Sequence, residues 1–432
     1  MAVAIDDVEA HEPGTVEGNL EVPGAGEDQP GYSIALGGWA LGADVAVEAL
    51  ELVAEGSAVA RIPVDGERPD IAAARPGVPD SGRSGFRAAV GALDLPRTFV
   101  VEAAAALSDG ARVPLWTLRG RRDPVLDPRP DGPRPLIVRG LGRTGSTWLT
   151  RLLGEHPEVV TYRPFAYEPR LLSYWIELLR ALCDPREGLR VLRPSSTAGR
   201  WLLRGAVPPE PLPLEDVRVA DALLDRGVRE LAAFGRNRVD SFYEAVASER
   251  GKPLVAFAEK GAINDARFMP PARLAQELYP RAREILLVRD PRDMVCSMLA
   301  YDERRGGAGF GRDNRDDPDW LLWLAEVLTA MTETDVALGE RSLLIRYEDL
   351  MADPETVMAR AFAHAGVDSA PDAVRAALDA AAALPVPDRH RTAGTKDSSV
   401  GRWRREMPPD LRREVDAAFG EPMALHGYEQ GP

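Results

Sequence analysis

The stretch PLIVRGLGRTGSTWLTRLLGEHP, residues 135–157, constrains the fold more than any other part of the sequence. The apolar run at 136–138 predicts a short buried strand, the glycines within 140–145 predict a turn, and leucines recur at helical spacing over 146–153. A strand that passes through such a turn into a helix N-terminus is typical of phosphate-binding sites, because the first amides of the helix are free to bind an anion. We therefore predict an α/β domain with an anion site at this turn.

The turn differs from the signature of nucleoside triphosphatases at one position. Gly140 and Gly145 have the spacing of G-x-x-x-x-G-K-[ST], but Ser146 stands where the signature has lysine. Triphosphatases use that lysine to hold β- and γ-phosphates. Two later apolar strands run into arginine, in LLVRD and LLIRY, so neither ends in a lone aspartate that would hold magnesium. These differences argue against a kinase or a triphosphatase.

Composition argues against several classes of protein. The formal net charge of −15 is unfavourable for nucleic-acid binding, which requires a basic face. No uncharged apolar run approaches the roughly 18 residues of a membrane helix, and the first residues have neither the basic nor the apolar region of a secretory signal. Cys183 and Cys296 form no disulfide framework, and the five histidines show no metal-ligand spacing. We expect a cytoplasmic protein without a metal site, a nucleic-acid partner or a membrane span.

Turn residues and short apolar segments divide the first part of the chain. Residues 1–30 are acidic and rich in glycine and proline, which predicts a flexible tail. Residues 31–122 contain short strand-like runs between turns, which predicts a small β-sandwich, although their alanine-rich pieces leave a mixed α/β lobe as an alternative. Residues 123–134 are dense in proline, which predicts a semi-rigid linker.

From residue 135 to residue 432, strand patterns alternate with helix patterns, which predicts an α/β fold with a parallel sheet flanked by helices. EILLVRD at 284–290 and SLLIRYEDL at 342–350 are the clearest further strands. Residues from about 171 to 250 are mostly helical and predict an insertion over the sheet. Since open α/β sheets bind ligands at the carboxyl ends of their strands, the residues that follow these strands are candidates for a site.

Three later segments carry polar residues at such positions. LLVRDPRDMVCSM places Arg289 after a strand and Ser297 eight residues further on, in a helix whose N-terminus Asp290 can cap. LLIRYEDLMADPE places Tyr347 at the end of a strand, and GTKDSSVGRWRREM, residues 394–407, forms a basic loop before the final helix. Taken singly, each segment also has a structural explanation as a helix cap, a set of surface ion pairs or a solvated loop.

In this order, the four segments resemble the motifs of sulfotransferases that use 3′-phosphoadenosine 5′-phosphosulfate. GRTGSTWL is similar to their 5′-phosphosulfate loop, P-[KR]-[SA]-G-[ST]-T, and LVRDPRDMVCSM is similar to their 3′-phosphate motif. IRYEDL, SSVGRW and ALHGY resemble their later signatures. The resemblance spans residues 135–432, with residues 171–250 poorly covered. It implies a P-loop-like sulfotransferase fold, a donor without a γ-phosphate, and a reaction that needs no magnesium.

The resemblance also implies which residues bind the donor. Arg143 stands where the family has lysine or arginine, and Trp148 and Tyr347 match aromatic residues near adenine. Arg289 and Ser297 match the ligands of the 3′-phosphate. The full set of expected donor-binding residues is Gly142, Arg143, Thr144, Gly145, Ser146, Thr147, Trp148, Arg289, Ser297, Tyr347, Lys396, Ser398 and Gly401.

In-line transfer to a hydroxyl requires a cation at the leaving oxygen and a general base for the acceptor proton. Arg143 is one candidate cation, and Lys260, which matches a family lysine, is the other, unless it is a surface cation paired with Glu259. Many cytosolic relatives have a histidine base after this lysine, where Gly261 follows here. Glu168, by similarity to the tyrosylprotein branch of the family, is the first candidate base and Glu259 the second; a helix-capping role for Glu168 stays open.

Two other functions stay open on the sequence alone. One is a P-loop kinase acting on a small molecule, and the other is a non-catalytic protein that binds a nucleotide or a carbohydrate. The acceptor of a sulfotransferase would be a hydroxyl of a small molecule or a glycan, and the sequence does not identify it. Binding of adenosine 3′,5′-bisphosphate without magnesium, compared with binding of ATP with magnesium, distinguishes a sulfotransferase from a kinase. Turnover distinguishes either enzyme from a binding protein.

Overall fold

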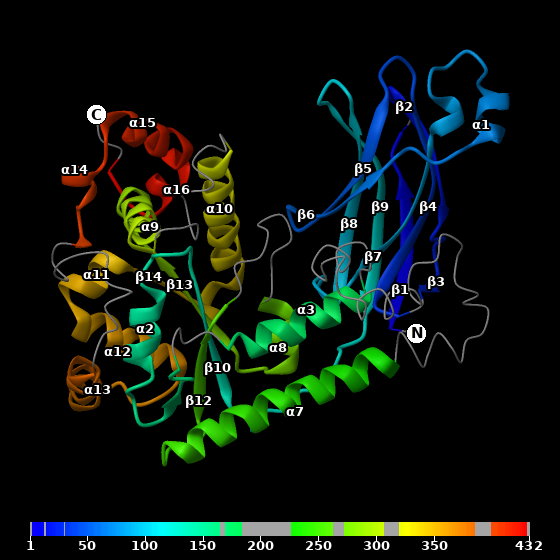
Figure 1. Ribbon diagram of the computed structural model, residues 1–432. Helices are drawn as coiled ribbons and strands as arrows, with labels where there is room; N and C mark the ends of the chain where they lie inside the picture. Colours follow the sequence, from blue (N-terminus) through cyan, green and yellow to red (C-terminus); the bar gives the residue numbers. More distant parts are fainter. Residues whose placement is uncertain are drawn as a thin grey trace. The chain divides into compact units, whose positions relative to one another are not determined.

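A computed structural model describes residues 2–12, 14–29, 31–164, 169–183, 226–261, 272–305, 319–384 and 399–429 (Figure 1). The chain forms two compact units. One consists of Met1–Pro128 with Tyr174–Arg236, and the other of Arg129–Ser173 with Asn237–Pro432. The first crossing between the units therefore lies inside the proline-dense segment 123–134.

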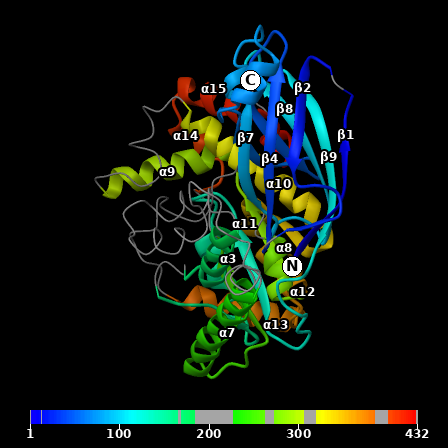
Figure 2. The same cartoon turned by 90° about the vertical axis from the view of Figure 1, so that its right-hand side faces the viewer.

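The N-terminal unit is built around two antiparallel sheets, which Figures 1 and 2 show from two directions. The larger sheet has the strand order β3-β1-β9-β8-β5-β6, and the smaller has the order β2-β4-β7. The strands are β1 Val3–Ala10, β2 Val16–Val22, β3 Glu27–Gln29, β4 Ser33–Gly42, β5 Val47–Ala54, β6 Ser57–Pro63, β7 Gly85–Gly91, β8 Thr98–Leu107 and β9 Arg112–Arg122. Between β6 and β7 lie a short helix, α1 Pro69–Ala74, and the 3₁₀ turn η1 Ser81–Arg83.

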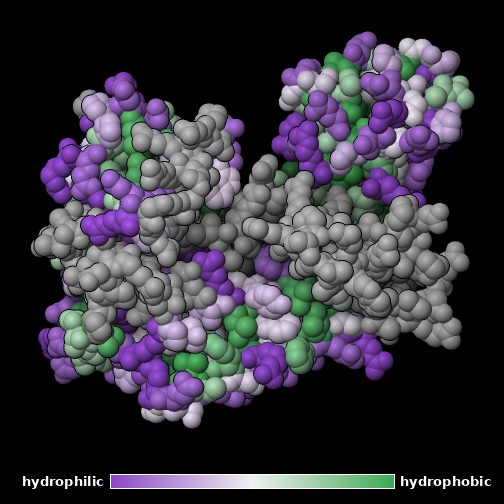
Figure 3. Space-filling view, in the orientation of Figure 1, coloured by the Kyte–Doolittle hydropathy of each residue, from purple (hydrophilic) through white to green (hydrophobic). Residues whose placement is uncertain are grey.

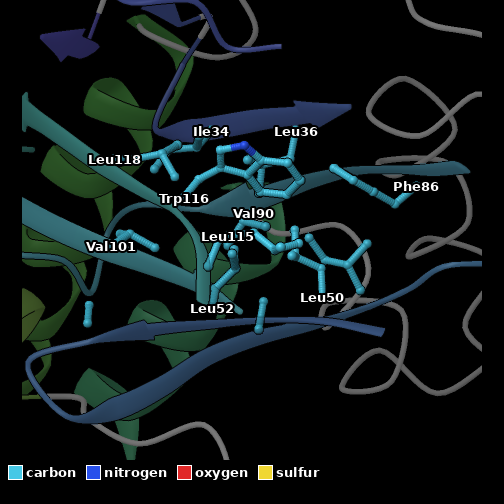
Figure 4. Close-up of a cluster of buried hydrophobic side chains, with 14 of the residues drawn as sticks. Ile34, Leu36, Leu50, Leu52, Phe86, Val90, Val101, Leu115, Trp116 and Leu118 are labelled. Atoms are coloured by element: carbon cyan, nitrogen blue, oxygen red, sulfur yellow. The ribbon is translucent and has the colours of Figure 1, made fainter. Parts of the chain in front are cut away.

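One continuous hydrophobic core joins the two sheets. Trp116 of β9 lies at its centre and is surrounded by Ile34, Leu36 and Val90 from the smaller sheet (Figure 4). The Trp116 and Phe86 rings are 5.9 Å apart between centroids, a distance typical of tilted aromatic pairs. Two facing sheets with one shared core make a β-sandwich, so the predicted sandwich is confirmed and the mixed α/β lobe is not.

The prediction of a flexible tail over residues 1–30 is wrong, because this segment contributes β1, β2 and β3 to the sheets. β1 pairs with β9 from Val3 opposite Arg122 to Ala10 opposite Trp116. Its residues alternate in the manner of a strand, so Val3 and Ile5 enter the core while acidic residues remain outside. The acidic composition that suggested a tail belongs to the solvent-facing side of these strands.

The second unit contains a five-stranded sheet with the order β11-β12-β10-β13-β14, and all its pairs are parallel. Its strands are β10 Arg134–Arg139, β11 Val159–Val160, β12 Ala256–Lys260, β13 Arg283–Val288 and β14 Ser342–Arg346. The helices that follow in the chain are α2 Ser146–Leu153, α3 Leu171–Cys183, α7 Arg226–Glu249, α8 Ala272–Leu278, α9 Pro291–Arg305, α10 Trp320–Leu338, α11 Tyr347–Ala352, α12 Pro354–Ala365, α13 Pro371–Ala383, α14 Trp403–Glu406, α15 Pro409–Ala418 and α16 Gly420–Leu425. The predicted α/β fold is confirmed.

Helices cover both faces of this sheet (Figure 1). Leu136 and Val138 of β10 pack in one core with residues of α2, α12 and α13. Leu286 and Val288 of β13 belong to a second core, which contains residues of α9, α10 and α15. A sheet buried on both faces explains why its strands read as continuous apolar runs.

The carboxyl ends of the parallel strands lie along one edge of this sheet. β10 lies between β12 and β13, with Val138 opposite both Lys260 and Ile285. The chain leaves β10 into the glycine-rich turn, leaves β13 at Arg289, and leaves β14 at Tyr347. The fold therefore brings the glycine-rich turn, Arg289 and Tyr347 to a common edge of the sheet, where ligands of such sheets bind.

The described residues include no helix long and apolar enough to cross a membrane. Figure 3 shows hydrophilic residues spread over one face of the molecule, with hydrophobic residues in small separate areas. Cys183 and Cys296 are both buried, and neither forms a disulfide.

Candidate functional site

Two glycines of the turn, Gly140 and Gly145, lie where the surrounding structure leaves no room for a side chain. Gly145, the N-cap of α2, has φ of +99°, and a Cβ there would lie 2.6 Å from Cδ2 of Tyr347. A Cβ on Gly140 would lie 2.5 Å from the carbonyl oxygen of Leu287. The turn is therefore packed directly against the ends of β13 and β14, and its glycines are required for that approach.

Gly145→Ala is expected to destabilise the protein and weaken anion binding at the turn. The left-handed backbone alone costs a non-glycine residue about 1–2 kcal/mol, and the added methyl group also displaces Tyr347. Gly110→Ala is the matched control, because Gly110 has φ of +87° but a Cβ there would meet no neighbouring atom within 4 Å. Thermal melts and titrations with adenosine 3′,5′-bisphosphate compare the two variants. Equal losses of melting temperature and of affinity would contradict the tight contact with Tyr347.

The hydroxyl groups of the turn have different surroundings. Thr144 is buried, and its hydroxyl donates to the carbonyl of Leu141 over 2.8 Å, so it stabilises the turn itself. Ser146 and Thr147, in the first turn of α2, are partly exposed. Trp148 is also partly exposed and packs against the core under α2, with the Arg151 guanidinium 5.5 Å from its ring centroid.

Arg143 extends from the turn toward α9. Its φ is +67°, and its Nε donates to Ser297 Oγ over 3.2 Å. Its guanidinium lies 4.7 Å from the centre of the Tyr301 ring, one helical turn beyond Ser297. Burial, together with the nearby charges of Arg289 and Arg402, lowers the pKa of Arg143 to about 10. The side chain stays cationic at neutral pH, and an anion would relieve the mutual repulsion of these arginines.

Arg289 joins three segments of the chain. Its Nη1 donates to the carbonyl of Arg143 over 3.0 Å, and its Nη2 donates to the carbonyl of Ser399 over 2.6 Å. The guanidinium lies 4.6 Å from the centre of the Tyr347 ring. Its buried Nε finds no hydrogen-bond partner among the residues that the structure describes. A buried donor without a partner is costly, so this Nε marks a place where an anion can bind.

Hydrogen bonds hold the loop before α14, residues 399–402, beside Arg289 and Tyr347. The hydroxyls of Tyr347 and Ser399 are 2.9 Å apart. Asp293, in the first turn of α9, accepts from the amides of Gly401 over 2.6 Å and Trp403 over 2.9 Å. Gly401 therefore lies near the cluster of arginines, as its expected role requires. Lys396 and Ser398 lie outside the described residues.

Sequence reasoning missed Asp293, Ser399 and Tyr301 as members of this cluster. In the sequence, Asp293 is one of several charges in RDPRD, and Tyr301 is one more aromatic residue in a helix. No spacing links either of them to the turn. Only the position of Tyr301 four residues after Ser297 indicates that both lie on the same side of α9.

Lys260 is the last residue of β12 and lies on the other side of the turn. It is 4% exposed, and its Nζ donates to Thr147 Oγ1 over 2.6 Å. The candidate transfer cation is thus in direct contact with a hydroxyl in the first turn of α2. The ion pair of Lys260 with Glu259 that the sequence left open is not observed, because successive strand residues point to opposite faces and the Glu259 carboxylate binds elsewhere.

Glu259 binds the start of α3. Its carboxylate accepts from the amides of Leu171, Leu172 and Ser173, at 3.1, 2.9 and 3.4 Å, and from the Tyr243 hydroxyl at 2.8 Å. Burial raises the pKa of Glu259, while these hydrogen bonds act in the opposite direction. Glu168, the first candidate for the general base, lies outside the described residues.

The described residues contain no group of three or more histidine, cysteine, aspartate or glutamate side chains that could hold a metal ion. What the structure brings together is a glycine-rich turn at a helix N-terminus, Arg143, Arg289 and Ser297 on one side, and Lys260 on the other. This arrangement can bind an extended anion with two separated negative groups.

Comparisons with known proteins agree with this description of the second unit. A family profile described as "Sulfotransferase family" matches residues 135–372, a range that contains the turn, Lys260, Arg289 and Tyr347. Carbohydrate sulfotransferase 3 of Mus musculus is 26% identical over 181 residues, 39% of this chain and 38% of its own length. This chain therefore spans well under half of that relative.

Two solved structures are also similar. The sulfotransferase domain from the Synechococcus PCC 7002 olefin synthase has a TM-score of 0.39 and 17% identity, covering 70% of this chain and 99% of its own. The mouse sulfotransferase SULT7A1 complexed with PAP has a TM-score of 0.36 and 14% identity, covering 70% of this chain and 91% of its own.

Proposed function

This chain belongs to the sulfotransferase family, and on that premise we propose that it transfers a sulfuryl group from 3′-phosphoadenosine 5′-phosphosulfate to a hydroxyl of an acceptor. The products are the sulfated acceptor and adenosine 3′,5′-bisphosphate. The proposal requires no metal ion.

One observation supports this choice of donor. Arg289 lies beside the glycine-rich turn, where its guanidinium donates to the carbonyl of Arg143, and its buried Nε has no hydrogen-bond partner among the described residues. A donor with a 3′-phosphate and a 5′-phosphosulfate supplies two anionic groups. In the proposed complex the 3′-phosphate binds at Arg289 and Ser297, and the 5′-phosphosulfate binds at the amides of the turn and at Ser146 and Thr147.

The chemical step is an in-line displacement at sulfur. A bond forms between the acceptor oxygen and sulfur, and the bond between sulfur and the bridging oxygen of the donor breaks. The electron pair stays on that oxygen, where Lys260 and Arg143 are the proposed stabilising cations. The acceptor proton passes to a general base, for which we propose Glu168. Glu259 is less suited to this role, because two amides, or an amide and a hydroxyl, already donate to each of its oxygens.

The acceptor is proposed to be a hydroxyl of a small molecule or of a glycan. The glycan is included because the mouse relative is named a carbohydrate sulfotransferase, although the similarity covers only 38% of that protein. A panel of acceptors that contains phenols, alkyl alcohols and oligosaccharides therefore covers the proposed range.

Thermal melts and transfer assays test the proposed function. Adenosine 3′,5′-bisphosphate with a chelator present should raise the melting temperature, because a ligand at 100 times its Kd stabilises the folded state by about 2.7 kcal/mol. ATP with magnesium should have a smaller effect. Incubation with labelled donor should then sulfate at least one acceptor of the panel. Stabilisation by ATP and magnesium alone would favour a kinase, and bisphosphate binding without transfer to any acceptor would favour a binding protein.

A further inference from the structure

Glu259 is a buried carboxylate whose hydrogen-bonding capacity is filled. It is 1% exposed, and four donors surround it: Oε1 accepts from the amides of Leu172 and Ser173, and Oε2 accepts from the amide of Leu171 and the hydroxyl of Tyr243. An ionised carboxylate offers about four lone-pair positions and no proton. Its full set of donors therefore matches the ionised form of Glu259.

Three of these donors are the first amides of α3. The amides at the start of a helix have no partner within the helix, and a negative charge there is favourable. α3 thus receives its N-terminal cap from β12, a strand that lies 86 to 88 residues later in the sequence. The link is specific, because it fixes the first turn of α3 to one residue of the sheet.

The neighbouring residue of the same strand is Lys260. Successive side chains of a strand point to opposite faces, so Glu259 reaches α3 while Lys260 reaches Thr147 over 2.6 Å. Both side chains are buried, at 1% and 4% exposure, and the pairing of β12 ends just beyond them, where the Gly261 amide donates to the carbonyl of Val138. Movement of Glu259 would therefore move the backbone that carries Lys260.

We infer that Glu259 is a positioning residue, which locks the first turn of α3 and the Lys260 end of β12 into one arrangement. The inference rests on the proposed function, in which Lys260 acts on the leaving oxygen. Glu259 then holds the backbone of Lys260 in a fixed position relative to the first turn of α3.

Glu259→Gln tests this inference with little change of shape. In either orientation of the new amide, its NH₂ group faces two of the four donors, so two hydrogen bonds are lost. Tyr243→Phe is the matched control. It removes one donor, leaves the three α3 amides bound, and keeps the ring that stacks on Phe257 at a centroid distance of 4.0 Å.

Two measurements do not depend on activity. Amide hydrogen exchange over 171–173 should be faster in Glu259→Gln than in the wild type or in Tyr243→Phe. The chain has only three lysines, Lys252, Lys260 and Lys396, so reductive ¹³C-methylation gives few NMR signals, and Lys260→Arg assigns the relevant one. The Lys260 signal should shift in Glu259→Gln. An unchanged exchange rate, or an unchanged Lys260 signal, would overturn the inference.

Measurements of activity then distinguish a positioning role of Glu259 from a role as the general base and from a purely structural role. Glu259→Gln should lower kcat per folded molecule by about 10- to 100-fold, the range typical of misplaced catalytic groups. Phenol and alkyl alcohol acceptors should lose the same factor. A much larger loss for the alcohol would make Glu259 the general base and overturn the inference, as would a lower melting temperature with unchanged kcat. If the wild type transfers no sulfuryl group, the proposed function fails, while exchange and the lysine signal still decide whether Glu259 couples α3 to Lys260.

Discussion

Replacing Lys260 with alanine is expected to lower kcat by about 10²–10³, the effect typical of removing one fixed group that stabilises developing charge. In the proposed reaction, negative charge develops on the oxygen between sulfur and the 5′-phosphate. Lys260 contacts Thr147 in the turn proposed to bind this part of the donor, so its charge is close to that oxygen. Phenol and alkyl alcohol acceptors should lose the same factor, because the charge lies on the donor. Initial rates with labelled donor measure the effect.

Lys252→Ala is the matched control for the loss of a half-buried lysine. Lys252 Nζ donates to the carbonyls of Gly154, His156 and Val159, at 2.8, 2.7 and 3.2 Å, beyond the end of α2. Its replacement should lower the melting temperature and leave kcat per folded molecule unchanged. In Lys260→Ala, affinity for adenosine 3′,5′-bisphosphate should fall as well, because its 5′-phosphate carries the leaving oxygen and its negative charge. If Lys260→Ala keeps the wild-type kcat while chemistry is shown to limit turnover, another cation, such as Arg143, stabilises the charge on the leaving oxygen.

Replacing Arg289 with alanine is expected to remove most of the thermal stabilisation by adenosine 3′,5′-bisphosphate. Hydrogen bonds to charged groups contribute about 1.5–3 kcal/mol each, so affinity should fall roughly 10- to 100-fold. Arg289 is 5% exposed, and it also donates hydrogen bonds to the carbonyls of Arg143 and Ser399. Its loss therefore both removes the charge and loosens the turn. Melting curves at a series of bisphosphate concentrations measure the loss.

Arg283→Ala provides the control for a change in the same strand. Arg283 begins β13 at the opposite end from Arg289, is exposed, and donates to the carbonyl of Glu340 over 3.0 Å. Its replacement should leave the bisphosphate shift unchanged. If Arg289→Ala retains the full shift while folded, the 3′-phosphate binds elsewhere and the assignment of Arg289 and Ser297 is wrong.

Local pattern was sufficient for the elements around the site. The apolar run at 136–138, the glycines after it and the leucines of 146–153 predicted β10, the turn and α2, because each depends on the residue types of a short segment. The strands before Arg289 and Tyr347 were predictable for the same reason. The sandwich of residues 31–122 was predictable from its short runs and turns, even though β8 is rich in alanine.

Local pattern failed where a segment pairs with a distant one. Residues 1–30 look acidic and loose by composition, but β1 lies against β9, with Val3 opposite Arg122. The energy of such a strand comes from hydrogen bonds and side-chain burial against a partner more than a hundred residues away. No window of sequence contains both strands, so composition was a poor guide.

The class of fold and the residue types at the edge of the sheet could thus be predicted from short segments of the chain, because strands, turns and helix starts have local signals. The contacts of those residues depend on the folded chain. It placed Arg143 against Ser297, Lys260 against Thr147, and Glu259 against the start of α3. Neighbours in a strand face opposite sides of a sheet, so the adjacent residues Glu259 and Lys260 acquire different partners, and only the folded chain shows which partners these are.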